Sequence, residues 1–218
     1  FNFPNFKYTF IGHPLYHIKK SKQKNNHKYI SLLFGSRENE INKLHKYFNL
    51  IENYIDSNKL NFKIFIPTVP HLKNIIINKT KNWKTEKIIL DDIDKFDQYY
   101  SDVFISVTCS GTASLEIAKR NIPQIVIYKL NYTTEILLSF FVNIKNACIL
   151  NIISKKEIIP EVVNSNLNKK SLIKTFEKLL NDKNFRESQI NSINNCLPYI
   201  ESNSSPYDIS AKRILSLI

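Results

Sequence analysis

The segment VTCSGTASLEIAKRNIPQIVIYK (Val107–Lys129) is the best indicator of fold class, because it joins the end of an apolar run to a helical pattern and then to a second apolar run. Gly111 stands at the first of these joins and is one of only 3 glycines in 218 residues. A chain so poor in glycine is expected to keep it where the backbone takes a conformation that other residues avoid. We therefore predict a tight turn at Gly111, a helix over Ala113–Arg120 and a buried strand over Pro123–Tyr128.

The same alternation extends outward from this unit. Short apolar runs predict further strands at Tyr29–Phe34, Phe62–Pro67, Glu86–Leu90, Asp102–Val107 and Ala147–Leu150. Helical patterns lie between most of them, and the clearest has apolar residues at steps of three and four from Ile41 to Ile55. Another helix is predicted over 133–142, and the pattern is helical from about Glu161 to the end.

Strands that are apolar throughout and alternate with helices are typical of a parallel sheet covered on both faces. Right-handed crossovers then make the fold class α/β, a doubly wound Rossmann-like parallel sheet, followed here by C-terminal helices. In such sheets a ligand binds beyond the carboxyl ends of the strands, where loops enter helices.

Composition narrows the class of protein. The net charge of +12 fits an anionic partner, or else a drift toward Lys, Asn and Ile from AT-rich coding DNA. Cys109, Cys148 and Cys196 are widely spaced, which predicts reduced thiols without disulfides and no zinc site. No apolar run approaches the roughly 20 residues of a membrane span. The absence of Met predicts a piece of a longer protein.

Several catalytic motifs are missing from the sequence. It has no Walker A pattern, no G-x-G-x-x-G, no H-E-x-x-H and no G-x-S-x-G. ATP hydrolysis, NAD chemistry, zinc proteolysis and α/β-hydrolase activity therefore lose their simplest support.

Two loops at the predicted ligand edge have residues suited to phosphate. Gly35–Arg37 and Ser110–Thr112 each follow a strand and precede a helix, where free N–H groups and a partial positive charge attract anions. Arg37 offers planar, bidentate donors in a chain that uses Lys nearly everywhere else. Plainer interpretations stay open: an exposed ion pair of Arg37 with its acidic neighbours at 38 or 40, and an ordinary N-cap with Glu116 as its capping-box partner.

Two other polar residues are candidates with plain alternatives. Glu116 lies one turn into its helix and could reach a pair of ribose hydroxyls, if it is not the capping partner. His13 follows the first apolar run and precedes Pro14, so a structural role at a hinge or linker competes with a catalytic one.

Four motifs, taken in order, resemble one family. FIGHPL, LLFGSRENEI, CSGTASLEIAKRNIPQIVIYK and ILNIISKKEIIPEVV are similar in order and spacing to the C-terminal half of lipid-A-disaccharide synthase, from about Phe10 to the C-terminal helices. The resemblance implies half of a GT-B glycosyltransferase of bacterial lipopolysaccharide biosynthesis. Such an enzyme condenses UDP-2,3-diacylglucosamine with 2,3-diacylglucosamine 1-phosphate, with inversion, to give the β-1,6-linked disaccharide 1-phosphate and UDP. Such an enzyme needs neither a cofactor nor a metal.

The resemblance also implies roles for individual residues. Arg37 would offset charge on the departing UDP and, with His13 of the GHP motif, forms the expected catalytic set. The expected UDP-binding residues are Gly35, Ser36, Ser110, Gly111, Thr112, Glu116 and Asn151. Glu161 is a possible acceptor-side residue. KKEIIPE departs from the family's usual form, because Lys155 and Lys156 replace a Gly-Arg pair, which puts any contact from that Arg in doubt.

The implied organisation has three parts. Residues 1–27 form an N-terminal segment and inter-domain junction, 28–160 a Rossmann-like UDP-sugar-binding domain, and 161–218 helices that pack back toward an N-terminal domain. The general base is expected from that other half, so the chain alone is expected to bind UDP without catalysing transfer.

Partners follow from the same resemblance. They are a UDP-sugar donor, an acylated glucosamine phosphate acceptor, the N-terminal half of the enzyme, and the cytoplasmic membrane surface at the inner face of the inner membrane. No nucleic acid is expected. Two alternatives stay open: another GT-B UDP-sugar enzyme, either a transferase or an epimerase, and a basic domain that binds RNA or a membrane surface without catalysis.

Overall fold

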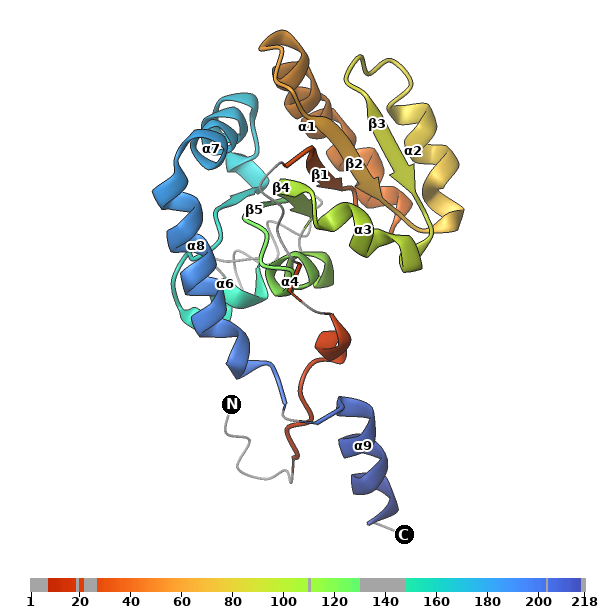
Figure 1. Cartoon of the computed structure of the whole chain (residues 1–218), viewed down its shortest axis with the longest axis vertical. Coiled ribbons are helices and arrows are strands. Elements are labelled where there is room, and N and C mark those ends of the chain that lie inside the picture. The colour runs from red at the N-terminus through yellow and green to blue at the C-terminus, as the bar shows by residue number, and fades with distance from the viewer. Residues whose placement is uncertain are drawn as a thin grey trace.

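Six strands form one parallel sheet in a computed structural model that describes residues 8–18, 20–21, 27–109, 111–129, 148–202 and 204–216. The strands are β1 (Tyr29–Leu33), β2 (Lys63–Pro67), β3 (Lys87–Leu90), β4 (Val103–Cys109), β5 (Gln124–Tyr128) and β6 (Glu161–Val163). Their spatial order is β3-β2-β1-β4-β5-β6 (Figure 1). All five pairings are parallel, and the order reverses between β1 and β4. The predicted doubly wound sheet is confirmed.

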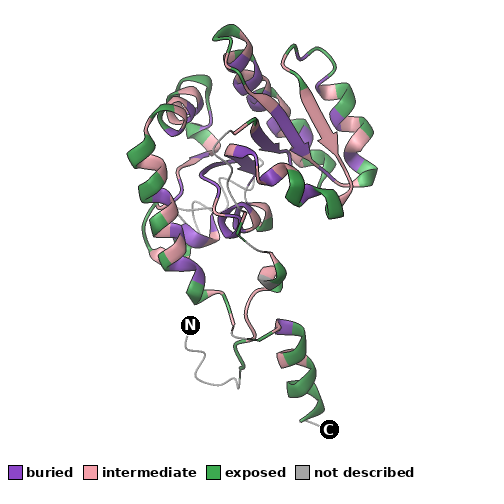
Figure 2. Ribbon diagram, in the orientation of Figure 1, coloured by how far each residue is buried: buried purple, intermediate pink, exposed green. Residues whose placement is uncertain are grey.

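Helices connect the strands and cover the sheet. The α-helices are α1 (Glu38–Ser57), α2 (Lys73–Lys79), α3 (Phe96–Tyr100), α4 (Thr112–Lys119), α6 (Ile149–Ser154), α7 (Lys169–Asn181), α8 (Lys183–Cys196) and α9 (Pro206–Leu215). Short 3₁₀ turns are η1 (Pro14–His17), η2 (Pro70–Leu72), η3 (Ile93–Lys95), η4 (Asn164–Asn166) and η5 (Leu197–Tyr199). As Figure 2 shows, the central strands are buried while the helices carry exposed outer faces, which is why the strands are apolar throughout.

Alternate side chains along β2 enter separate cores. Ile64 and Ile66 of β2 pack in the cluster that contains the apolar side of α1, while Phe65 between them joins the opposite cluster with Tyr100 and Ile117. The predicted apolar steps of α1 are its buried face: Ile41, Leu44, Phe48, Ile51 and Ile55. Side chains on one face recur every 2 residues in a strand and every 3.6 residues in a helix. These two periods direct the apolar side chains of β2 and α1 to the same core.

Polar side chains join α8 to the sheet. The Oε1 of Gln189 accepts from the backbone N–H of Gln124 at 2.6 Å, and its Nε2 donates to the carbonyl of Gln124 at 3.0 Å. Gln124 in turn donates from its side chain to the carbonyl of Ser114 at 2.8 Å. These buried bonds hold β5 against α8 and α4, the helix that carries the second predicted loop.

Two predicted elements are wrong. The strand predicted over Ala147–Leu150 is not formed in its described part, because Cys148 is the N-cap of helix α6 and Ile149 and Leu150 are its first residues. A four-residue apolar run is too short to show which period it follows. The predicted helical tail begins with strand β6, because Val162 is buried beside Ile127 at the edge of the sheet. The helix predicted over 133–142 lies outside the described residues.

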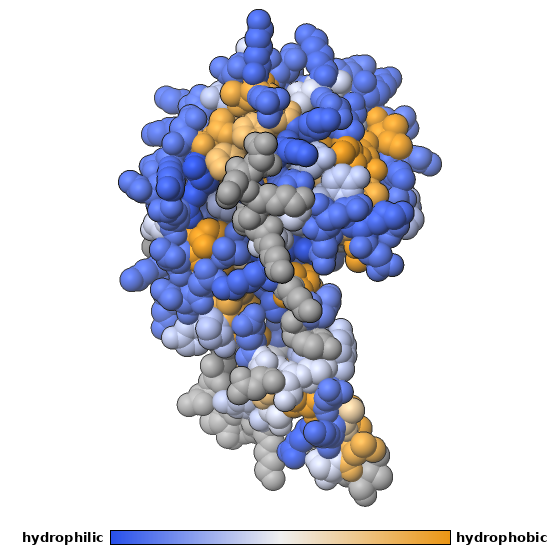
Figure 3. All heavy atoms as spheres, in the orientation of Figure 1, coloured by the Kyte–Doolittle hydropathy of each residue, from blue (hydrophilic) through white to orange (hydrophobic). Residues whose placement is uncertain are grey.

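α9 lies away from the sheet, at the opposite end of the molecule from α1 and α2 (Figure 1). It exposes apolar side chains, including Ile214 and Leu215, and hydrophobic residues show on the surface at that end (Figure 3). Among the residues that the structure describes, no helix combines the length and apolarity needed to cross a bilayer.

Candidate functional site

Two loops meet at the carboxyl edge of the sheet, where the strand order reverses. β1 pairs directly with β4, with Leu32 opposite Val107. The loop Gly35–Arg37 after β1 and the turn at Gly111 after β4 are therefore neighbours, and each leads straight into a helix, α1 or α4. This is the position at which doubly wound sheets bind ligands.

A cleft of about 420 Å³ opens between these loops. That volume lies within the range of small-molecule sites. Six of the residues predicted to act on the nucleotide line it: Gly35, Ser36, Arg37, Gly111, Thr112 and Glu116. The structure thus brings together side chains and backbone that are about 75 residues apart in sequence.

Arg37 stands directly before α1, and its side chain is 78% exposed. Its Nη1 donates to Oε1 of Glu40 at 3.1 Å, so Glu40 and not Glu38 is its ion-pair partner. The other carboxylate oxygen of Glu40 lies so close to Gly35 that a Cβ there would collide with it. An exposed pair of this kind contributes less than about 1 kcal/mol, so a phosphate can displace Glu40 at small cost.

The N-terminus of α4 is open to the cleft. Its N-cap is Gly111, and within the described part of the chain no side chain caps it. The capping box is not formed, because the N-cap Gly111 has no hydroxyl and Glu116 lies five residues beyond it, where its Oε1 accepts from Arg120. The first turn of α4 contains no acidic residue, whereas that of α1 contains Glu38 and Glu40. The N–H groups and positive end of α4 are therefore the better setting for an anion.

Gly111 is required by its backbone. Its φ of 113° and ψ of −149° lie in a region that is essentially restricted to glycine. A Cβ built at this position would meet no described heavy atom within 4 Å. Conformation and not crowding therefore demands glycine, and the adjacent space is open to a ligand. Ser110, predicted with it, lies outside the described residues.

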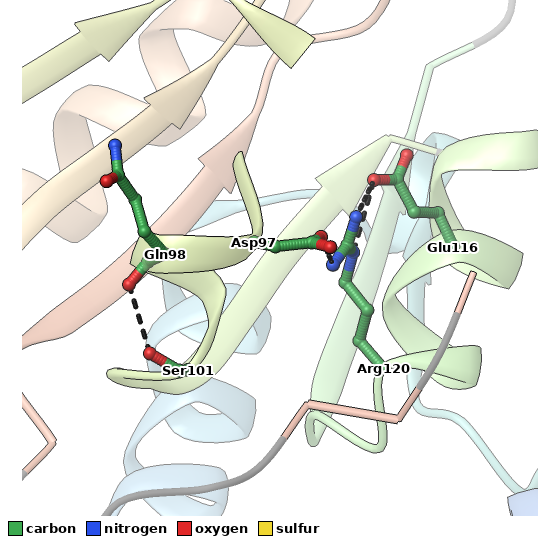
Figure 4. Close-up of polar contacts among 5 residues, drawn as sticks. All are labelled: Asp97, Gln98, Ser101, Glu116 and Arg120. Carbon is green, nitrogen blue, oxygen red and sulfur yellow. Dashed lines mark hydrogen bonds and ion pairs between the residues drawn. The ribbon is translucent and has the colours of Figure 1, made fainter. Parts of the chain in front are cut away.

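Glu116 points along α4 toward Arg120, one turn later (Figure 4). Nε and Nη2 of Arg120 lie 3.3 and 3.2 Å from Oε1 of Glu116, and Nη1 contacts the carboxylate of Asp97 on α3. Burial raises the pKa of the Glu116 carboxyl, and the Arg120 charge opposes that rise. The carboxylate is thereby held in the wall of the cleft between α3 and α4.

Three of the cleft residues that the sequence analysis missed carry a hydroxyl group or an aromatic ring. Thr68 follows β2, while Phe96 and Tyr100 belong to α3, and all three line the cleft. The hydroxyl groups of Thr68 and Tyr100 are buried and find no hydrogen-bond partner among the described residues. Thr68 could have been predicted, because it follows the carboxyl end of β2, and β2 is the neighbour of β1 at the edge where ligands bind.

His13 is placed elsewhere. Its backbone N–H donates to the carbonyl of Ile200 at 2.8 Å, and its Nδ1 accepts from Leu15 at 3.2 Å. Burial and the nearby charge of Lys119 lower its pKa. His13 is not among the cleft residues, and its catalytic role stays a prediction.

Asn151 and Glu161 form a separate cluster outside the cleft. Oδ1 of Asn151 accepts from the backbone of Ile158 and Ile159, both at 2.9 Å, and its Nδ2 donates to Oε1 of Glu161 at 2.6 Å. The same Glu161 oxygen accepts from Cys148 at 3.1 Å. These bonds tie α6 to β6, and in this arrangement Asn151 uses its amide on protein groups. Contacts of either residue with a nucleotide or acceptor stay predictions.

The Cys109 thiol borders the cleft but is expected to be inert. Burial raises its pKa to about 12, with a smaller contribution from the charge of Glu40. Only on the order of one thiol in ten thousand is then ionised at pH 8. We expect iodoacetamide at pH 8 to leave Cys109 unlabelled in the folded protein and to label it in guanidinium chloride, as read by mass spectrometry. Rapid labelling of the folded chain at Cys109 would contradict this.

Comparison with known sequences matches this chain to proteins of one family. A family model described as lipid-A-disaccharide synthetase matches residues 1–214. A lipid-A-disaccharide synthase from Wigglesworthia glossinidia brevipalpis is 32% identical, over 82% of this chain and 50% of that protein. The chain spans about half the length of the curated relatives it matches.

Solved structures share the fold at low identity. The C-terminal domain of a glycosyl transferase group 1 family protein from Francisella tularensis is 13% identical with a TM-score of 0.56, covering 86% of this chain and 98% of that one. A UDP-GlcNAc 2-epimerase from Neisseria meningitidis, bound to UDP-GlcNAc, is 15% identical with a TM-score of 0.54, covering 88% and 46%. These similarities show a fold of the GT-B type.

Proposed function

The chain belongs to the lipid-A-disaccharide synthetase family, and we propose that it is the donor-binding part of an inverting glycosyltransferase that makes lipid A disaccharide. The observation that carries the proposal is the shared cleft, in which the Arg37 loop and the uncapped start of α4 face each other across the strand-order reversal. A guanidinium and a helix N-terminus together suit a diphosphate.

In the proposed reaction the 6-hydroxyl of 2,3-diacylglucosamine 1-phosphate attacks the anomeric carbon of UDP-2,3-diacylglucosamine. The bond from that carbon to the diphosphate breaks, and UDP leaves with its electron pair. The hydroxyl proton passes to a general base. Arg37 and the N–H groups at the start of α4 would stabilise the charge that develops on UDP.

Glu116 would accept hydrogen bonds from the ribose, which places the nucleoside against α3. The neighbouring N–H groups at Gly111 and Thr112 would then hold the phosphates, with Gly35 and Ser36 on the opposite wall. Ser110 is proposed for the same phosphate loop. His13, Asn151 and Glu161 remain proposed contributors from the surrounding segments.

The three-part organisation is proposed on the same basis: a junction at 1–27, the nucleotide-sugar domain at 28–160 and C-terminal helices at 161–218. Strand β6 at 161–163 continues the sheet of the central part. The general base and the acceptor site would come from an N-terminal half of the enzyme.

A peripheral position on the cytoplasmic face of the inner membrane is also proposed. A net charge of +12 favours contact with anionic lipid, and both substrates are acylated. Exposed apolar side chains on α9 would add to that contact.

Calorimetric titration of UDP tests the proposal. We expect the chain to bind UDP at a single site and to form no disaccharide when given both acylated substrates. A basic surface that merely binds anions would instead respond equally to ADP and lose affinity steeply with salt. Absence of saturable UDP binding, or disaccharide synthesis by the chain alone, would contradict the proposal.

A further inference from the structure

Arg120 is buried at the end of α4, with only 8% of its side chain exposed. Its guanidinium carbon lies 4.1 Å from the centre of the Tyr100 ring, which supports one face of the group. Such a site holds a planar cation in a fixed orientation.

Two edges of this guanidinium are used by different carboxylates. Nε and Nη2 both donate to Oε1 of Glu116, while Nη1 donates to Oδ1 of Asp97 (Figure 4). Among the described residues, no hydrogen-bond donor reaches Oε2 of Glu116. One oxygen of Glu116 is therefore fixed by the protein, and the other is left for a donor in the cleft.

Glu116 also stands between two hollows. It lines the cleft, and it lines an adjoining cavity of about 400 Å³ that contains Asp97 and Arg120 but not the glycine loops. A flexible carboxylate in this position can turn toward either hollow. The bond to Arg120 removes that freedom, and the Arg120 charge opposes the rise in the pKa of Glu116 that burial causes.

We propose that Arg120, braced by Asp97 and by the Tyr100 ring, is a positioning residue that fixes the Glu116 carboxylate as the acceptor for the ribose hydroxyls of a bound nucleotide. The inference rests on the proposed function, because it assigns the nucleoside end of the same ligand. Asp97 is 82% exposed, so its pair with Arg120 adds little to stability and acts chiefly on the direction of the guanidinium.

The test compares UDP with 2′-deoxy-UDP by calorimetry on the full chain. We expect the wild type to prefer UDP by about tenfold, the value of a hydrogen bond to a charged group. Arg120→Lys keeps the positive charge but loses the fork, and is expected to lower the preference to about twofold or less. Asp97→Asn is expected to give a preference for UDP between that of the wild type and that of Arg120→Lys. A purely structural role of Arg120 would weaken both nucleotides equally and leave their ratio unchanged.

A control variant sharpens the comparison. Glu187→Gln removes an exposed carboxylate that pairs with Lys183 on α8, away from the cleft, and should leave the preference for UDP as in the wild type.

The outcomes separate the inference from the function on which it rests. If folded Arg120→Lys keeps the full preference for UDP, the inference is wrong. If that variant does not fold, Asp97→Asn, a change at an exposed residue, replaces it, and an unchanged preference in Asp97→Asn would show that the inference is wrong. Wild-type binding of UDP without preference over 2′-deoxy-UDP would also overturn the inference alone. Failure of the wild type to bind UDP would overturn both.

Discussion

Replacement of Gly111 by valine is expected to weaken UDP binding by about 100-fold or more, which corresponds to roughly 3 kcal/mol. The backbone of Gly111, at φ 113° and ψ −149°, would cost a β-branched residue about 1–3 kcal/mol. The chain would relieve this strain by rotating the turn, and the N–H groups at the start of α4 would no longer converge on the diphosphate. Any Cβ that did stay in place would project into open space that the ligand needs.

Calorimetry measures this effect, with thermal unfolding recorded beside it. Gly12→Val is the matched control, because Gly12 also has a positive φ of 82° but is not a cleft residue. That change is expected to lower stability without altering the UDP affinity of the folded chain. Equal affinity in wild type and folded Gly111→Val would show that the diphosphate binds elsewhere.

Arg37→Ala is expected to weaken UDP binding by about 10- to 100-fold, since a hydrogen bond to a charged group contributes about 1.5–3 kcal/mol. The same change should weaken the binding of UMP, which lacks the second phosphate, much less. The fold should be unaffected, because the side chain is 78% exposed and its pair with Glu40 contributes less than about 1 kcal/mol. In the full-length enzyme the same change should lower kcat, because charge on UDP grows as the bond breaks.

Glu40→Gln provides a control with the opposite sign. It removes the carboxylate that holds Arg37 at 3.1 Å and that would repel a diphosphate. We expect UDP to bind about two- to threefold more tightly, with an effect that shrinks as salt is added. If Arg37→Ala and Glu40→Gln both leave UDP affinity unchanged, the Arg37 loop does not contact the ligand.

Much of this architecture could be predicted from the sequence because it depends on local patterns. The apolar runs were long enough to indicate five strands, and parallel strands place their carboxyl ends on one edge. That rule alone brought Arg37 and Gly111 to the same place. Strand β6 was missed because three residues with one buried side chain, Val162, carry too little pattern.

The electrostatic detail of the site could not be predicted in the same way. Asp97 is 23 residues from Arg120 in the chain, and nothing local indicates that α3 places its carboxylate on that guanidinium. Glu116 had two plausible roles in the sequence, a cap or a ligand contact, and the N-cap at Gly111, five residues earlier, excludes the capping box. The contact between α3 and α4 depends on the packing of helices and not on periodicity.

The placement of β1 at the middle of the sheet has a consequence for how the protein is made. β1 can pair with β2 as soon as both have left the ribosome, but its other edge must wait for β4, and the buried bond between Ser31 and Ser106 closes a separation of 75 residues. Pairings this remote are slow to form. Until β4 pairs with it, β1 of a nascent chain has an unpaired edge. Misfolding and aggregation can compete with folding during this time, which ends when the second half of the sheet assembles.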